Sequence, residues 1–209
     1  MLFAVSTFAV AAALIVLLPG PDTLVMIRGL VRGGRSRGIA TACGILTGLA
    51  VWVSAAALGL SALVEASSIG YDVLRIAGAV YLIWLGVQSL LLRRDRAAAQ
   101  AAGEQPLAGR GLFGSGFGAG LLTDLLNPKV GVFFVSFLPG FVPDGASVGW
   151  STLLFGAIFI AETALYCTVL VLLAGRVTAW MNAPKTRRRL DTATGSVLIA
   201  FGIRLALEP

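Results

Sequence analysis

Four charged residues lie within or beside long apolar stretches of the sequence: Asp22, Asp124, Lys129 and Glu162. A charge at membrane depth is costly, and such groups usually mark a substrate or ion pathway. Lys129 could attract a carboxylate or pair with an acid. The acids could contact an ammonium or carry a coupling proton, and Asp124 and Glu162 are the candidates for coupling. The structural alternative is that Lys129 and Asp124 pair with each other or extend toward an interface.

Two of these charges belong to motifs that break helices. Each motif follows a Leu-Leu pair, and the two read Pro19-Gly20-Pro21-Asp22 and Asn127-Pro128-Lys129. Proline removes a backbone donor and clashes with the preceding turn. Non-helical backbone at membrane depth is tolerated only where protein or a water-filled cavity satisfies it. The two motifs therefore predict interrupted helices beside a cavity.

A helix that restarts after such a break can bind charged groups. We expect Asp22 and Asn127 to be N-caps and Pro128 to occupy the first helical position. The N-terminus of a helix has unpaired N–H groups and a partial positive charge, which attract a carboxylate. The unwound carbonyls can accept hydrogen bonds from an ammonium. The pair of breaks therefore suits a zwitterion such as an amino acid, bound by residues 19–22 and 127–129.

Composition indicates an integral membrane protein. Of the 209 residues, 57% are hydrophobic and 12% are charged, whereas a soluble domain has about 25% charged residues. At about 20 residues per membrane-spanning helix, the apolar residues suffice for roughly six spans. An ordinary cytosolic enzyme, a disordered chain and a secreted disulfide scaffold are excluded.

The sequence offers little to a metal or a catalytic centre. It contains no histidine, which excludes a histidine triad or a histidine metal cage. Cys43 and Cys167 lie in apolar stretches without a CxxC motif, and this favours buried packing over a disulfide or a thiolate site. We expect neither a cofactor nor a metal site. Arginines in cytoplasmic loops explain the net charge of +6 better than a nucleic-acid partner does.

Six hydrophobic segments order the chain: Leu2–Leu30, Gly38–Val64, Ile69–Leu92, Leu112–Val142, Gly149–Gly175 and Leu190–Leu207. Most basic residues lie in the first, third and fifth loops (Arg28, Arg32, Arg35 and Arg37; Arg93, Arg94, Arg96 and Arg110; Arg176, Lys185, Arg187, Arg188 and Arg189). Because cytoplasmic loops are enriched in Lys and Arg, these three loops are predicted to be cytoplasmic and both termini extracytoplasmic. Recognition of anionic lipids by the arginines is the alternative.

The positions of the breaks predict an internal repeat. Each break lies in the first segment of a half that contains three segments, and an odd number of spans inverts the second half. The prediction is a single transmembrane domain with repeats at residues 1–92 and 112–209, joined by a cytoplasmic linker at 93–111. Gly44, Gly48 and Gly118 are spaced for close helix packing or a hinge, and small-residue faces also permit a homodimer.

In order along the chain, several motifs resemble the LysE/RhtB family of bacterial amino-acid exporters. They are Pro19–Asp22, Arg32–Gly38, Gly44 with Gly48, Gly78–Leu82 with Leu85-Gly86, Asn127–Lys129, Phe137–Phe141 and Gly195–Ile199 with Gly202–Ala206. The resemblance implies a multi-pass inner-membrane exporter of an amino acid or a derivative, driven by the proton gradient. It also implies that the Pro-Gly-Pro and Asn-Pro-Lys motifs are core elements.

The resulting hypothesis is a secondary transporter whose partners are an amino acid, protons and the lipid bilayer. Its substrate would lie near the midplane between the two breaks. A cation or metal-ion exporter of similar architecture is the alternative, although it would need more carboxylate, histidine or thiol ligands. A membrane-embedded enzyme would need a nucleophile–base or metal constellation, which the sequence does not show.

Overall fold

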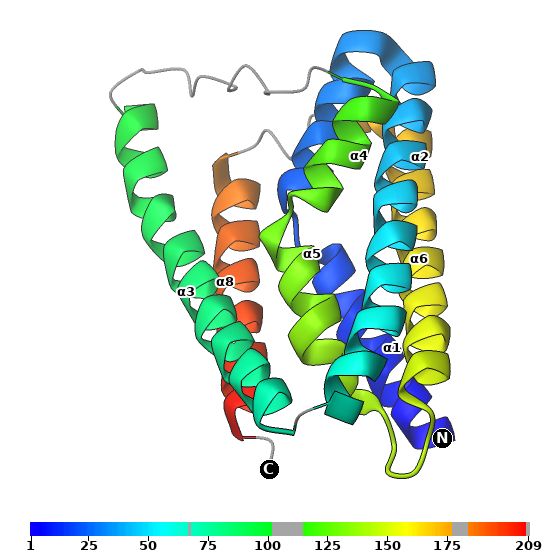
Figure 1. Cartoon of the computed structure of the whole chain (residues 1–209). Coiled ribbons are helices and arrows are strands. Elements are labelled where there is room, and N and C mark those ends of the chain that lie inside the picture. The colour runs from blue at the N-terminus through cyan, green and yellow to red at the C-terminus, as the bar shows by residue number, and fades with distance from the viewer. Residues whose placement is uncertain (67, 102–114, 177–183, 208–209) are drawn as a thin grey trace.

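A computed structural model describes residues 1–66, 68–101, 115–176 and 184–207. Within these ranges the chain is helical, without a strand (Figure 1). The elements are α1 (Leu2–Leu17), α2 (Pro21–Ala66), α3 (Ser68–Ala101), α4 (Phe117–Leu125), α5 (Pro128–Val132), the π-helix η1 (Phe133–Phe137), the 3-10 helix η2 (Leu138–Phe141), α6 (Val148–Leu172) and α8 (Pro184–Leu207). The prediction of an all-helical class is confirmed for the described residues.

Helix α2 consists of two helices joined by a glycine pair. Gly33 and Gly34 have non-helical backbone angles, and Gly34 has φ 63°, a left-handed value that favours glycine. The chain reverses at this point, so the first part of α2 continues in the direction of α1 and the second part returns beside it (Figure 1). The reversal falls between the first two predicted hydrophobic segments.

Two groups of helices form the bundle. Helices α1, α2, α4, α5 and α6 lie together, and α3 and α8 run side by side next to them (Figure 1). Glycines bring α3 and α8 into close contact, since a Cβ at Gly86 would lie 2.7 Å from the Gly195 carbonyl oxygen. Helix α3 ends at Ala101, so the predicted linker at 93–111 begins inside a helix, and residues 102–114 lie outside the described part.

Phenylalanine rings fill much of the core and join elements that are distant in sequence. Phe8 of α1 stacks on Phe155 of α6, with ring centroids 4.6 Å apart. Phe133 of η1 packs on Phe159 of α6 at 4.8 Å. Aromatic pairs of this kind add packing energy beyond the apolar area they bury. The cluster fixes α1 and η1 against α6.

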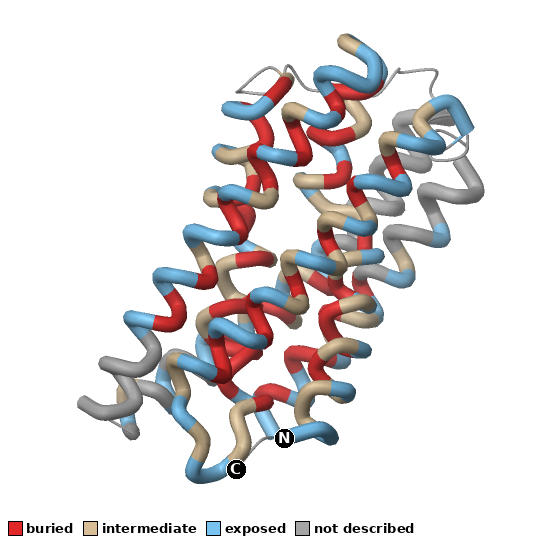
Figure 2. The backbone as a smooth tube through the Cα atoms, turned by 90° about the vertical axis from the view of Figure 1, so that its right-hand side faces the viewer, coloured by how far each residue is buried: buried red, intermediate tan, exposed pale blue. Residues whose placement is uncertain are grey.

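The outer surface of the bundle is apolar. Figure 2 shows buried positions on the inner faces of the helices and exposed positions on the outer faces. Large hydrophobic side chains are among the exposed ones, including Leu58 (77%) and Trp150 (76%). A monomeric soluble protein rarely exposes such extensive apolar surface, whereas lipid covers it in a membrane. The exposed side chains therefore support a membrane protein.

Length and hydropathy identify the membrane-crossing candidates among the described residues. By length and composition, Val148–Leu172 can cross a bilayer, as can the stretch Pro21–Gly59, which contains the reversal at Gly33-Gly34. Phe117–Leu125 and Pro128–Phe141 qualify together as one span bent by 50°. Shorter apolar helices occur at Leu2–Leu17, Ile76–Gln88 and Gly195–Leu207. The structure thus has two or three clear spans and several shorter apolar helices.

Candidate functional site

The first break lies between α1 and α2. Helix α1 ends at Leu17, the cap residue Leu18 is extended (ψ 116°), and α2 begins at Pro21. The predicted interruption at Pro19–Pro21 is confirmed. Asp22, however, is not an N-cap as predicted, because Pro21 already starts the helix and Asp22 lies in its first turn. The carboxylate still lies where the partial positive charge of the helix stabilises it.

The second break lies between α4 and α5. Helix α4 ends at Leu125, and Asn127 caps α5 because its Oδ1 accepts a hydrogen bond from the Lys129 backbone N–H at 3.1 Å. Pro128 occupies the start of α5, where its missing N–H is not needed. The predicted cap and the predicted proline position are both confirmed.

The two breaks contact each other through reciprocal hydrogen bonds. Asn127 Nδ2 donates to Asp22 Oδ2 at 2.6 Å. Lys129 Nζ donates to the Leu18 carbonyl at 3.2 Å and to the Ile15 carbonyl at 3.4 Å. These carbonyls belong to the C-terminal end of α1, where a helix attracts a cation. Each break therefore supplies a polar group that the other break requires.

Gly20 makes room for the lysine. A Cβ at Gly20 would lie 3.1 Å from Lys129 Nζ, so a larger residue would crowd the ammonium. The predicted alternative was a structural pair between Lys129 and Asp124. In the structure, Lys129 Nζ donates to backbone carbonyls of α1 instead, and neither carboxylate oxygen of Asp124 has a hydrogen-bond partner among the described residues. The Pro-Gly-Pro motif thus ends one helix, starts another and admits the side chain of Lys129 between them.

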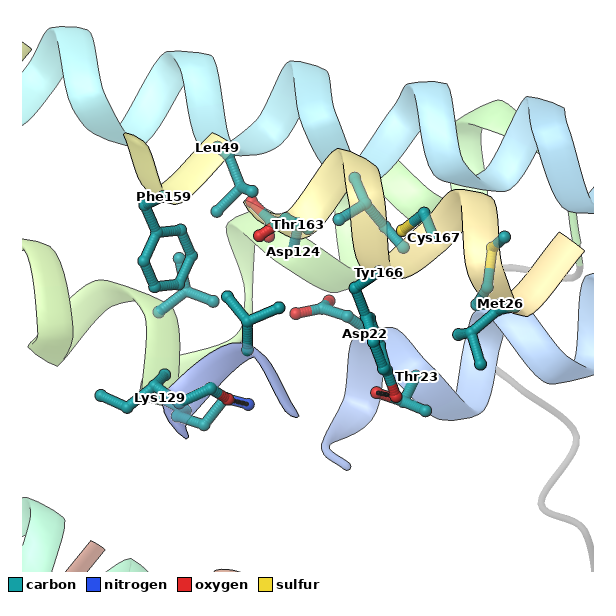
Figure 3. A pocket seen from close by; sticks show the side chains of 15 residues that line it. Asp22, Thr23, Met26, Leu49, Asp124, Lys129, Phe159, Thr163, Tyr166 and Cys167 are labelled. Carbon is teal, nitrogen blue, oxygen red and sulfur yellow. Dashed lines mark hydrogen bonds between the residues drawn. The ribbon is translucent and has the colours of Figure 1, made fainter. Parts of the chain in front are cut away.

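A cavity lies beside the two breaks (Figure 3). Its empty volume is about 440 Å³, part of which is open to solvent. Side chains from α1, α2, α4, α5 and α6 line it. The polar ones are Asp22, Thr23, Asp124, Lys129, Thr163 and Tyr166, and the apolar walls include Ile45, Leu49, Met26, Phe159 and Leu170. An apolar pocket with a few convergent polar groups is the usual form of a ligand site.

Asp124 is the most enclosed acid of the cavity. The residue is 0% exposed, and neither carboxylate oxygen has a hydrogen-bond donor among the described residues. It packs on Gly48, where a Cβ would lie 2.5 Å from Oδ2. The nearby Trp52 Nε1 donates to the backbone oxygen of Asp124 at 3.4 Å and not to its carboxylate. Gly48 therefore creates the space that the carboxylate occupies.

Comparison with known proteins adds the family to this geometry. The LysE type translocator family matches residues 13–209. The chain belongs to this family. The prediction from the ordered motifs is confirmed, because the match covers both breaks and nearly the whole chain.

Relatives of this translocator cover almost its full length. It is 33% identical to an uncharacterized membrane protein of Pseudomonas aeruginosa, over 96% of this chain and 93% of that protein. It is 30% identical to the uncharacterized membrane protein YrhP of Bacillus subtilis, over 94% and 95%. It is also 30% identical to the leucine efflux protein of an Enterobacter species, over 96% and 93%. No solved structure matches the chain.

Of the remaining predicted residues, Gly44 serves helix packing, whereas Gly118 and Glu162 do not take part in the contacts or the cavity described above. Gly44 packs against the backbone of α4 at Phe117, so a side chain there would clash. Gly118 was predicted to serve packing or a hinge, but a Cβ there would meet nothing within 4 Å among the described residues. Glu162 is partly buried on α6 and is not one of the residues that line the cavity. Its neighbour Thr163 lines the cavity instead.

Sequence reasoning missed the contribution of α6 to the translocator. Thr163, Tyr166 and Cys167 all line the cavity, and the Tyr166 hydroxyl lies 3.4 Å from Thr23 Oγ1. Their spacing of three and four residues places them on one helix face, a signal that the sequence offered. The interpretation of both cysteines as buried was half wrong, since Cys43 is exposed and Cys167 is buried.

We predict that Asn127→Ala destabilises the translocator by about 1–3 kcal/mol, because it removes both an N-cap and a donor to a carboxylate. Thermal unfolding in detergent, followed by size-exclusion fluorescence, measures the effect. The control is Asn127→Asp, which keeps the capping oxygen but removes the N–H donor to Asp22. Equal stability of Asn127→Ala and the wild type would contradict this account of the second break.

Proposed function

We propose that this chain exports an amino acid across the bacterial inner membrane as a secondary transporter coupled to protons. The observation that supports the proposal most is the reciprocal contact of the two broken helices, which places an ammonium and two carboxylates beside one cavity. Membership of the LysE type translocator family supports it independently. So does the likeness to proteins named leucine efflux protein.

The substrate carboxylate binds Lys129 in this proposal. The ammonium of Lys129 donates to carbonyls of α1 in the structure, and charge-assisted hydrogen bonds to a carboxylate are stronger than those to neutral carbonyls. The substrate thus competes with the end of α1 for this lysine. Its ammonium binds Asp22, whose Oδ1 is buried and has no donor among the described residues.

The apolar wall of the cavity selects the side chain. Met26, Ile45, Leu49, Phe159 and Leu170 surround the polar groups. Burying an aliphatic side chain among them contributes about 1.5–3 kcal/mol, whereas an additional charge would lack a partner. We therefore assign amino acids with apolar side chains, of the size of leucine, as the substrate class.

The proposed architecture consists of six membrane passes in two inverted repeats. The start of α1 and the end of α8 lie at the same end of the bundle, and the reversal within α2 lies at the opposite end (Figure 1). The basic residues around that turn favour the cytoplasm, so both termini are assigned to the extracytoplasmic side. The repeats are residues 1–92 and 112–209, and each contributes one break to the cavity. Alternating access moves one repeat against the other.

Export of a metal ion has less support. Within the described residues, no group of three or more Cys, Asp or Glu side chains is placed to hold a metal ion. Metal transport sites usually combine several carboxylate, imidazole or thiolate ligands. The amino-acid assignment therefore takes precedence.

Efflux of preloaded amino acids tests the proposal. Cells that express the chain and are loaded with a leucine-containing dipeptide are expected to release leucine faster than cells with an empty vector. Asp22→Asn should reduce the rate about 10- to 100-fold, since a hydrogen bond to a charged group contributes about 1.5–3 kcal/mol. Asp144→Asn, in the exposed turn before α6 and outside the cavity wall, should leave efflux unchanged. Normal expression without faster efflux across a panel of amino acids would refute the function.

A further inference from the structure

The two acids of the cavity have different immediate neighbours. Asp22 lies in the first turn of α2, accepts a hydrogen bond from Asn127 and is electrostatically coupled to Lys129. The N-terminus of a helix, a donor and a cation all stabilise an ionised carboxylate. Asp22 therefore has three neighbouring groups that favour its ionised form, although its Oδ1 is buried without a donor among the described residues.

Asp124 shares the field of Lys129 but has neither the helix N-terminus nor a hydrogen-bond donor. It is the second-last residue of α4, so it lies at the helix end that disfavours an anion. It is fully buried, and neither oxygen accepts a hydrogen bond from the described residues. Burial of an ionised carboxylate without donors is very costly, and such a group takes up a proton instead.

The groups that face Asp124 from the surrounding elements explain when it can ionise. The cavity places Asp22 from α2, Lys129 from α5, and Tyr166 and Cys167 from α6 around it. Lys129 is the only cation of this set, and its hydrogen bonds are directed to α1. A positive charge that enters the cavity would therefore be the first new partner of an ionised Asp124.

We propose that Asp124 carries the coupling proton, whereas Asp22 stays ionised and holds the substrate ammonium. This inference rests on the proposed function and names the residue that couples it to protons. In the substrate-free cavity, Asp124 holds a proton on one carboxylate oxygen. Entry of the substrate brings an ammonium that stabilises the anion, and the O–H proton passes to water on the cytoplasmic side. After the substrate leaves, the carboxylate takes a proton from extracytoplasmic water, so proton and substrate move in opposite directions.

The test uses the purified full chain in liposomes with tritiated leucine and two assays. Exchange of internal for external leucine without a proton gradient measures binding and alternating access. Accumulation of leucine in vesicles with an acidic lumen measures proton coupling. We expect Asp124→Asn, which fixes a neutral side chain of the same shape, to retain exchange and to lose accumulation completely. Asp22→Asn should weaken both, and Asp144→Asn, in the exposed turn before α6, should keep both.

Each outcome decides the inference. Accumulation at the wild-type level by Asp124→Asn overturns it, as does loss of exchange by a variant that elutes as a folded protein. If Asp124→Asn does not fold, labelling of the wild type with a hydrophobic carbodiimide, read by mass spectrometry, replaces it, because the reagent modifies protonated buried carboxyls. Labelling at Asp124 that leucine prevents supports the inference, and its absence overturns it.

Failure of the proposed function gives a different result. A wild type that does not exchange leucine or any other amino acid of the panel contradicts the proposed function itself. A wild type that exchanges leucine but never accumulates it contradicts proton coupling, and with it the role of Asp124, while amino-acid transport stands.

Discussion

Replacing Lys129 with methionine is expected to abolish amino-acid efflux while the protein still reaches the membrane. The substitution keeps a flexible side chain of similar length but removes the ammonium that binds the end of α1 and, in the proposed function, the substrate carboxylate. Loss of one partner of a buried charge pair costs about 2–5 kcal/mol, which corresponds to a rate lower by roughly 30-fold to several thousand-fold. The efflux assay on dipeptide-loaded cells measures this.

The matched control is the second lysine of the sequence, Lys185. It lies in the first turn of α8, an element that contributes no residue to the cavity wall. Lys185→Met should therefore export leucine at the wild-type rate. Equal loss in both variants would show a general effect of lysine removal, and unchanged export by Lys129→Met would remove Lys129 from the site.

Substitution of Gly120 by alanine is expected to prevent stable folding. Helices α2 and α4 approach backbone to backbone here, and a Cβ at Gly120 would overlap the Thr41 carbonyl oxygen. The same two helices also meet at Gly44, where a Cβ would overlap the Phe117 carbonyl oxygen. A shift that accommodates Gly120→Ala would therefore also loosen this second contact. Overpacking a core lowers the free energy of unfolding by about 1–3 kcal/mol and sometimes more. Because backbone moves less easily than a side chain, we expect a loss at the upper end of this range for Gly120→Ala.

Gly118→Ala provides the control for this prediction, since it lies on the same helix two residues earlier and its Cβ would meet nothing within 4 Å. We expect a single monodisperse peak in fluorescence size-exclusion chromatography for Gly118→Ala and aggregated or absent protein for Gly120→Ala. A normal peak and melting temperature for Gly120→Ala would contradict the close approach of α2 and α4.

The breaks were predictable because proline and glycine act through local backbone chemistry. Pro19–Pro21 and Asn127-Pro128 mark the interruptions, and the Asn127 cap follows from residue type and position. Such signals act within a few residues, so a single sequence contains them. The prediction that Asp22 is an N-cap was wrong for an equally local reason. Proline can itself occupy the first position of a helix, and α2 begins at Pro21, one residue before Asp22.

The contacts between the breaks could not be predicted in the same way. Lys129 donates to backbone carbonyls of α1. Because every residue has a backbone carbonyl, residue types do not indicate which carbonyls a lysine will bind. Gly120 and not Gly118 packs against α2, because Gly120 lies on the face of α4 that meets α2. Both faces of α4 are apolar, so the sequence does not indicate which of them is the contact face. The polar face of α6, by contrast, was available from the spacing of Thr163, Tyr166 and Cys167.

The reciprocal bonding of the breaks also constrains the order in which the chain can be built. Lys129 follows Leu18 by 111 residues, so at synthesis rates of 5–20 residues per second the ribosome adds the lysine roughly 5 to 20 seconds after the leucine. During that interval the Leu18 carbonyl must find water or another temporary donor, since an unpaired carbonyl in lipid costs several kcal/mol. Until α5 has entered the membrane beside it, the end of α1 therefore lacks the hydrogen-bond donor that it has in the complete protein.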